Sequence, residues 1–352
     1  MARYRKSTIK EVAARAGVSV TTVSYFVSGR EDVCSPQTAE RIRSAVADLH
    51  YTPSSLVAGM QKGIRHSIGA MITSPWDSDI QYAGFFFERI WRGVFEQADK
   101  DDYSILRYSA NVRYSDRADM FLDGRVDGVL YHAHTDDNDR PAQIAKAGLP
   151  IVLITRSINI PEGCGAVYTD EAAVTHVALD HLWSLGHRRI GHLAGPVTPT
   201  SELEVVDDIA IARMRAYKSW MVEHEAHDPT LLRAANAWNG ADAAPHVDAW
   251  RSLESPPTAI LCANDDIAVS VIDHANGCGW KVPHTLSVVG IDNSNEAKAL
   301  TRNLTSIDPQ IHLLGREAMS CVQNIINGER AQDNRKAVGG AQWIDRGTVS
   351  AA

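Results

Sequence analysis

The sequence predicts a small all-α N-terminal domain followed by a larger α/β body with two parallel-sheet lobes. Residues 8–51 contain three short helical patterns, each preceded by a capping residue. From Ser67 onward, short apolar runs rich in β-branched residues alternate with longer helical segments, which is typical of βαβ units. About nine such runs over some 285 residues exceed one comfortable sheet, so we expect two α/β subdomains.

The first two helical patterns have the spacing of a helix-turn-helix. Thr8 and Glu11 are placed as a capping box, so the first helix is expected to begin after Thr8. Gly17 ends it, because glycine tolerates the positive φ of a tight turn. Ala13, Gly17 and Val23 form the pattern A-x3-G-x5-V, with a small residue at the helix crossing and a β-branched residue beneath it. An ordinary small helical bundle is the alternative interpretation.

Two further serines mark the starts of the second and third helices. Ser19 is a good N-cap for the second helix. Ser35 and Pro36 provide an N-cap and a proline at the first helical position of the third. The apolar stripe of the third helix has helical spacing and consists of Ile42, Ala45, Val46 and Leu49.

Charge is distributed unevenly along the chain. Residues 1–60 contain eight Lys and Arg against five acidic residues, a net charge of +3. The whole chain has a net charge of −8, so the remainder carries −11. A basic end on an acidic body is expected when that end meets phosphates, which favours DNA binding over a simple bundle.

Two segments stand apart from the regular patterns. Residues 52–60 combine Pro53 with Gly59, which weakens a helix by about 1 kcal/mol relative to alanine, so we expect a segment that is loose alone and helical only with outside support. Residues 198–212 are expected to form a mobile acidic loop.

The apolar runs and the segments between them define the expected elements of the body. Two of the intervening segments, 171–185 and 265–276, suit helices. The runs expected as strands are Ile68–Ile72, Tyr103–Tyr108, Val126–Tyr131, Ile151–Ile154, Val167–Tyr168, Arg189–Leu193, Ala259–Cys262, Ser287–Ile291 and Leu304–Ile307.

Composition argues against several classes of protein. No run of about 18 apolar residues could span a membrane. No apolar stretch follows the basic N-terminus, so a secretory signal is not expected. The five cysteines are scattered without a C-x-x-C pair, which indicates reduced thiols and a cytoplasmic protein.

Enzyme, metal and cofactor signals are weak. The pairs His224–His227 and His132–His134 lack the H-E-x-x-H form, so no metal is expected. Gly277–Gly279 lacks the third glycine of a dinucleotide site and does not follow a strand. We therefore expect neither an enzyme nor a cofactor. A transport-type solute-binding protein remains a rival for the body, although the basic N-terminal domain counts against it.

Several segments together resemble a known family. In the N-terminal part these are Thr8-Ile9-Lys10-Glu11-Val12-Ala13, Ala16-Gly17-Val18-Ser19, Thr22-Val23-Ser24 and Tyr51-x-Pro53-x-x-Leu56. In the body they are His181-Leu182, Gly186-His187, Gly195-Pro196, Ala263-Asn264-Asp265, Ser287-Val288-Val289-Gly290-Ile291-Asp292 and Leu304-Thr305-Ser306-Ile307. Over essentially the whole chain, this set resembles the lactose-repressor (LacI/GalR) family of bacterial transcription regulators.

The resemblance implies a homodimeric repressor with a periplasmic-binding-protein-like body, whose two Rossmann-like lobes are joined by three crossovers. It divides the chain into a helix-turn-helix headpiece (1–50), a hinge (51–63) and an effector-binding and dimerisation domain (64–352). Within that domain, the N-lobe is expected at about 64–164 plus 293–323, and the C-lobe at about 165–292 plus 324–352.

The second helix is expected to enter the major groove of operator DNA. By motif position, Val20, Thr21 and Tyr25 face the bases, with Val20 suited to a thymine methyl group. The family commonly has arginine at the position of Tyr25, and Ser28 and Ala39 replace residues that usually hold the DNA backbone. Leu56 is expected as a minor-groove wedge or, alternatively, as a contact at a domain junction. The candidate DNA-binding residues are Thr8, Ser19, Val20, Thr21, Thr22, Tyr25, Ser28, Arg30, Ser35 and Leu56.

One headpiece buries little surface, so two copies are expected on a pseudo-palindromic operator. The same geometry favours a homodimer.

Ligands of doubly wound sheets bind beyond the carboxyl ends of the strands. The effector-binding candidates at these positions are Ser74, Trp76, His132, Thr155, Arg156, Asn264 and Asp292. The resemblance implies that Arg213 clamps the effector and that Asn264 and Asp292 make polar contacts. Trp238 then forms an aromatic wall.

An aromatic wall with polar contacts suits a sugar, with a nucleobase or nucleoside as the alternative. Thr155 departs from the family, which usually has aspartate there. Asn264-Asp265 as a helix cap and Trp238 as a core residue are the competing structural interpretations.

Overall fold

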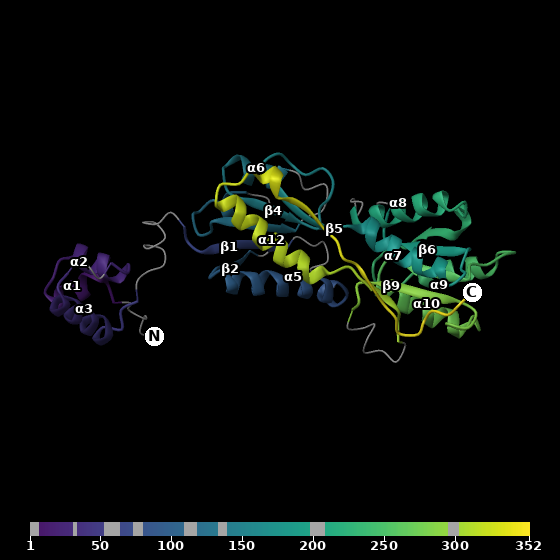
Figure 1. The fold of residues 1–352 in the computed structure, drawn as a ribbon, viewed down its shortest axis with the longest axis horizontal. Coiled ribbons are helices and arrows are strands. Elements are labelled where there is room, and N and C mark those ends of the chain that lie inside the picture. Colours follow the sequence, from purple (N-terminus) through teal and green to yellow (C-terminus); the bar gives the residue numbers. More distant parts are fainter. Residues whose placement is uncertain are drawn as a thin grey trace. The chain divides into compact units, whose positions relative to one another are not determined.

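The computed structural model describes residues 7–30, 34–52, 64–72, 80–108, 118–132, 139–197, 208–294 and 303–352. The chain divides into two compact units, Met1–His66 and Ser67–Ala352 (Figure 1). Most of the expected hinge and residues 198–207 of the expected acidic loop lie outside the described residues. The loop prediction is wrong for residues 208–212, which form the first turns of a helix. No helix in the described ranges combines the length and apolarity needed to cross a membrane.

The first unit contains α1 (Ile9–Ala16), α2 (Val20–Val27) and α3 (Pro36–Asp48). The expected capping box is confirmed: Thr8 Oγ1 accepts a hydrogen bond from the Glu11 amide at 3.3 Å, and the Thr8 amide donates to Glu11 Oε2 at 2.7 Å. Gly17 ends α1 with a φ of 66°. The apolar faces close a small core of Val12, Ala13, Ala16, Val23, Phe26, Ala39, Ile42 and Ala45.

In the second unit, a first parallel sheet has the strand order β11-β5-β4-β3-β1-β2. Its strands are β1 (Ser67–Ile72), β2 (Ser104–Tyr108), β3 (Gly128–His132), β4 (Ile151–Ile154), β5 (Gly165–Thr169) and β11 (Arg335–Val338). The helices of this lobe are α5 (Ile80–Lys100), α6 (Asp139–Lys146) and α12 (Ile311–Ile326), with the 3-10 turns η2 (Ala118–Phe121) and η4 (Ala331–Asn334).

Helices α5 and α12 lie side by side in this lobe (Figure 1). Glycines allow the close approach. A Cβ atom on Gly315 would collide with the carbonyl oxygen of Ile90, and one on Gly93 would collide with that of His312.

The second sheet has the order β12-β10-β9-β8-β6-β7, with β12 antiparallel to β10. Its strands are β6 (Ile190–Ala194), β7 (Leu232–Ala234), β8 (Ala259–Cys262), β9 (Ser287–Ile291), β10 (Ser306–Asp308) and β12 (Gln342–Ile344). The helices of this lobe are α7 (Glu171–Ser184), α8 (Asp208–Glu223), α9 (Ala243–Arg251) and α10 (Asp265–Gly277), with the 3-10 turn η3 (Pro229–Leu231).

Each apolar run that was expected as a strand overlaps with a strand of the structure. The two expected helices, 171–185 and 265–276, correspond to α7 and α10. The short strands β7, β11 and β12 were not expected. They lack long apolar runs, and β11 begins with exposed Arg335 and Lys336.

The lobe boundaries differ from those expected. β5 pairs with β4, with Leu153 opposite Ala166, so residues 165–169 belong to the first sheet and not to the second. β11 also joins the first sheet, whereas β10 joins the second. The chain therefore passes between the lobes after β5, between β10 and α12, and between β11 and β12. The positions of these crossovers follow from which strands hydrogen-bond to each other. The spacing of apolar runs along the sequence does not reveal that pairing.

Candidate functional site

Helix α2 presents the candidate DNA-reading side chains to solvent. Val20 and Tyr25 are 40% and 44% exposed, and Thr21 is also exposed. On the opposite side of the helix, Val23 and Phe26 are buried in the core. This burial pattern leaves the outer side of α2 open to a partner.

The candidate residues around Tyr25 form a local group. Ser28 Oγ donates a hydrogen bond to the Tyr25 carbonyl oxygen at 2.8 Å. The Arg30 guanidinium carbon lies 4.9 Å from the centroid of the Tyr25 ring, a cation–π distance. Arg30 is exposed, so its charge remains open to solvent beside the aromatic ring.

Other headpiece candidates have structural roles. Thr8, Ser19 and Ser35 are the N-caps of α1, α2 and α3, and Thr22 donates its amide hydrogen to Ser19 Oγ at 3.0 Å. The N-terminal end of a helix that is capped in this way can also face a phosphate.

Ala39, which stands where the family usually has a residue that holds the DNA backbone, is 5% exposed and packs in the core. Leu56 lies outside the described residues.

In the second lobe, Arg213 of α8 is the centre of a buried polar group. Its Nε atom donates to Glu171 Oε2 at 2.6 Å, and its Nη1 atom donates to the carbonyl oxygen of Ala263. Its Nη2 atom lies 4.0 Å from Asp292 Oδ1. Arg213 therefore bridges α7, the end of β8 and the end of β9.

Glu171 was not predicted as a site residue. Asp170 caps α7 by accepting from the Ala173 amide at 3.0 Å, which places Glu171 in the first helical turn. Carboxylates are favoured there by the partial positive charge of the helix N-terminus. Glu171 follows the carboxyl end of β5, so the rule that selected the other candidates would have identified it if β5 had been placed to its full length.

Asp292 directly follows β9 and has a φ of 112°, in the region that favours glycine. Its burial raises the pKa of the carboxyl group well above the usual range; Arg213 opposes that shift, whereas Asp265 and Glu171 add to it. Backbone strain and a carboxyl group of raised pKa at one residue are typical of functional sites.

Asn264 and Asp265 have different structural roles. Asn264 caps α10 by accepting from the Ile267 amide at 2.9 Å. Asp265 does not provide this cap; it accepts hydrogen bonds from Ser306 Oγ at 2.6 Å and from the Ser294 amide at 2.7 Å. Burial raises the pKa of Asp265 to about 6, and these hydrogen bonds limit the shift.

Trp238 is held beside the same group. Asn264 Nδ2 donates to the Trp238 carbonyl oxygen at 2.9 Å. A Cβ atom on Gly195 would lie 2.6 Å from the indole ring, so the ring packs directly on that glycine. Trp238 is partly buried against the apolar core, which agrees in part with the core interpretation. Glu171, Arg213, Trp238, Asn264 and Asp292 are called the Arg213 cluster below.

The first-lobe candidates lie on the other sheet. His132 ends β3 and contacts Phe87 edge-on, with ring centroids 4.8 Å apart. Thr155 follows β4 with a φ of 68°, and its hydroxyl donates to the Ile154 carbonyl oxygen at 2.6 Å. The buried guanidinium of Arg156 donates to the carbonyl oxygens of Ile158 and Asn159.

Ser74 and Trp76 lie outside the described residues.

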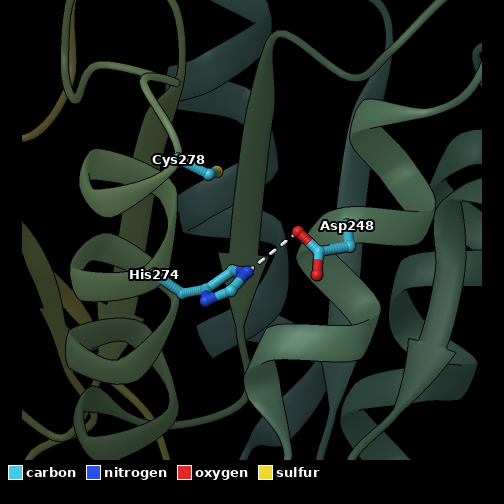
Figure 2. A group of neighbouring side chains, drawn as sticks. All are labelled: Asp248, His274 and Cys278. Atoms are coloured by element: carbon cyan, nitrogen blue, oxygen red, sulfur yellow. Dashed lines mark hydrogen bonds and ion pairs between the residues drawn. The ribbon is translucent and has the colours of Figure 1, made fainter.

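A separate group of possible metal ligands lies at the far end of α10 from Asn264 (Figure 2). His274 Nε2 is 2.9 Å from Asp248 Oδ1, and Cys278 Sγ donates to the Ala275 carbonyl oxygen at 3.3 Å. The ligand atoms lie within 4.8 Å of one another. A single zinc ion would need bonds of about 2.0–2.3 Å to each ligand. The contacts observed are a hydrogen bond between His274 and Asp248 and one from the Cys278 thiol to its own helix.

Comparisons with known proteins give a consistent pattern. Residues 8–54 match a family model for bacterial regulatory proteins of the lacI family, and residues 179–349 match one for a periplasmic binding protein-like domain. The HTH-type transcriptional repressor PurR of Photobacterium profundum is 27% identical over 335 residues, covering 93% of this chain and 92% of the relative.

Two solved structures share the fold. A lac repressor dimer bound to operator and the anti-inducer ONPF is 22% identical with a TM-score of 0.78, covering 99% of this chain and 100% of that one. A complex of the transcriptional regulator CelR with cellobiose is 24% identical with a TM-score of 0.68, covering 97% of this chain and 100% of that one.

Proposed function

The chain belongs to the LacI family of bacterial regulatory proteins, and from that premise we propose that it is a homodimeric repressor controlled by a carbohydrate effector. It is a DNA-binding transcriptional regulator and not an enzyme. Its partners are operator DNA and a small-molecule effector. The Arg213 cluster carries the proposal for the effector, since it gathers an indole ring, an amide and carboxyl groups beyond the strands of one sheet.

A sugar suits these groups chemically. The face of the Trp238 indole can pack on the C–H face of a pyranose ring, while carboxylate and amide groups hydrogen-bond to its hydroxyls. The CelR structure, which shares the fold, was solved with cellobiose. A nucleobase or nucleoside would also stack on the indole ring, and it is the alternative outcome of the experiment below.

In the proposed mechanism, effector binding between the lobes changes the geometry at the hinge. The hinge residues, with Leu56 as the proposed minor-groove wedge, then release operator DNA or hold it. The coupling is reciprocal: an effector that weakens operator binding must itself bind less tightly to the DNA complex. Val20, Thr21 and Tyr25 are the proposed base-reading residues, with two headpieces on a pseudo-palindromic operator.

The test begins with selection of bound genomic fragments by the purified full-length chain. Fluorescence anisotropy on the selected duplex, at fixed salt, then measures operator affinity with neutral sugars, sugar acids and nucleosides. A palindromic preference and a sugar-dependent change in affinity are expected. Absence of preference for any duplex would refute the regulator mechanism, and a response to nucleosides alone would replace the sugar.

A further inference from the structure

The Arg213 guanidinium is already engaged by groups of the protein. Glu171 Oε2 accepts from Nε at 2.6 Å, and the two side chains are only 3% and 9% exposed. A backbone carbonyl oxygen at Ala263 accepts from Nη1. Burying a charged pair is unfavourable unless the charges compensate each other, and here Glu171 compensates Arg213.

The surroundings of this pair are rich in carboxyl groups. Asp292 Oδ1 lies 4.0 Å from Arg213 Nη2. The charges of Asp265 and Glu171 both raise the pKa of Asp292. Because Glu171 and Asp292 both lie beside the guanidinium, any negative group that approaches Arg213 must approach these carboxyl groups as well.

We propose that Glu171 neutralises Arg213 and thereby restricts the effector to uncharged polyhydroxy compounds, with sugar phosphates and sugar acids excluded. This inference rests on the proposed effector site. Hydroxyl groups both donate and accept, so a neutral sugar can donate to the Glu171 carboxylate, which repels an anion. Selectivity then comes from a repulsive element as much as from attraction.

A purely structural role for the pair is the competing explanation. In that case Glu171 only ties the first turn of α7 to α8, and its charge has no effect on which ligands bind. Glu171→Gln separates the two explanations, because glutamine keeps the size and a hydrogen-bond acceptor while removing the charge.

The experiment uses inorganic phosphate as the probe, titrated calorimetrically into the full-length protein without DNA. We expect no Arg213-dependent phosphate binding by the wild type. Glu171→Gln should bind phosphate at least tenfold more tightly, and the double variant Glu171→Gln/Arg213→Gln should lose that gain. Glu254→Gln is the matched control, because it removes one exposed carboxylate elsewhere and should leave phosphate binding unchanged.

Two results would overturn the inference. One is phosphate binding by the wild type that Arg213→Gln abolishes, which needs no Glu171 variant and so covers the case in which that variant does not fold. The other is a folded Glu171→Gln protein with no gain in phosphate affinity. Because neither measurement uses operator DNA or a sugar, a failure here is distinguishable from failure of the proposed regulator function.

Discussion

Arg89 of α5 donates hydrogen bonds from its Nη2 atom to both carboxylate oxygens of Asp308 in β10, each at 3.0 Å. The same guanidinium donates through Nη1 to the backbone carbonyl oxygen of Asp292 at 2.8 Å. One side chain thus joins the first lobe to the backbone of Asp292, a residue of the proposed effector site in the second lobe. Burial alone would raise the pKa of Asp308, but hydrogen bonds from Asn293, the Gln310 amide and Arg89 lower it overall.

Replacing Arg89 with glutamine should lower the free energy of unfolding by about 1–3 kcal/mol, because charged hydrogen bonds to a mostly buried carboxylate are lost. Arg92→Gln on the same helix is the control: Arg92 lies 3.5 Å from Glu88, and both are more than half exposed. That variant should change stability by less than about 0.5 kcal/mol. Urea unfolding measures both; equal losses would contradict a special role for Arg89.

The pH dependence of stability should report on Asp265. Its pKa is raised from 3.8 to about 6 in the folded protein, so the folded state holds the proton more tightly than the unfolded state. The free energy of unfolding should therefore fall as pH rises from about 4 to 6, by on the order of 1–3 kcal/mol from this group. Asp265→Asn should reduce that slope, with Asp292 contributing in the same direction. A slope unchanged by the substitution would reject this assignment.

The crossing of α5 and α12 should be intolerant of added side chains. Gly315→Ala places a methyl group against the carbonyl oxygen of Ile90, so we expect a loss of about 1–3 kcal/mol or more. Gly277→Ala in α10 meets nothing within 4 Å and should be neutral or slightly stabilising. Thermal unfolding of both variants tests the contrast, and a Gly315→Ala protein as stable as wild type would show that the helices can separate at no cost.

Local signals explain which parts of the fold were predictable. Thr8 and Glu11 specify the start of α1 by contacts three residues apart, and the sequence displays such spacing directly. β11 depends on pairing between Arg335 and Ala166, which no local pattern records. Parallel pairing between strands that lie far apart in the sequence depends on how the whole lobe assembles. The expected lobe boundaries were wrong for that reason.

In the candidate site, too, some residues could be predicted from local sequence and others could not. Asp292 lies at the end of a strand, where the position rule predicted a polar site residue. Arg156 met the same rule, yet carbonyl oxygens of its own loop accept from its guanidinium. Glu171 was missed because the expected strand 167–168 ended short of the full length of β5, and nothing in the sequence indicated that Glu171 pairs with Arg213, 42 residues further along the chain.

Gly195→Ala should disturb the proposed aromatic wall. The added methyl group would lie 2.6 Å from the Trp238 ring and must displace it. We expect at least a tenfold loss of effector affinity and a shift in tryptophan emission. Gly191→Ala, in the strand that leads to Gly195, is the matched control, since its Cβ would make only ordinary contacts at 3.5 Å. Effector affinity that is equal in the two variants would remove Trp238 from the site.

Tyr25 and Arg30 touch each other, yet they should affect DNA binding differently. Tyr25→Ala removes a proposed base contact, so operator affinity should fall by about 1–3 kcal/mol while affinity for random duplex is little changed. Arg30→Gln removes a proposed phosphate contact, so affinity for both duplexes should fall and the slope of log affinity against log salt should decrease by about one. Anisotropy titrations across a salt series separate these effects. Because Tyr25 is 44% exposed, its replacement should leave helix content intact, as circular dichroism can verify. If Tyr25→Ala instead weakened both duplexes equally, the ring would serve to position Arg30 and would not read bases.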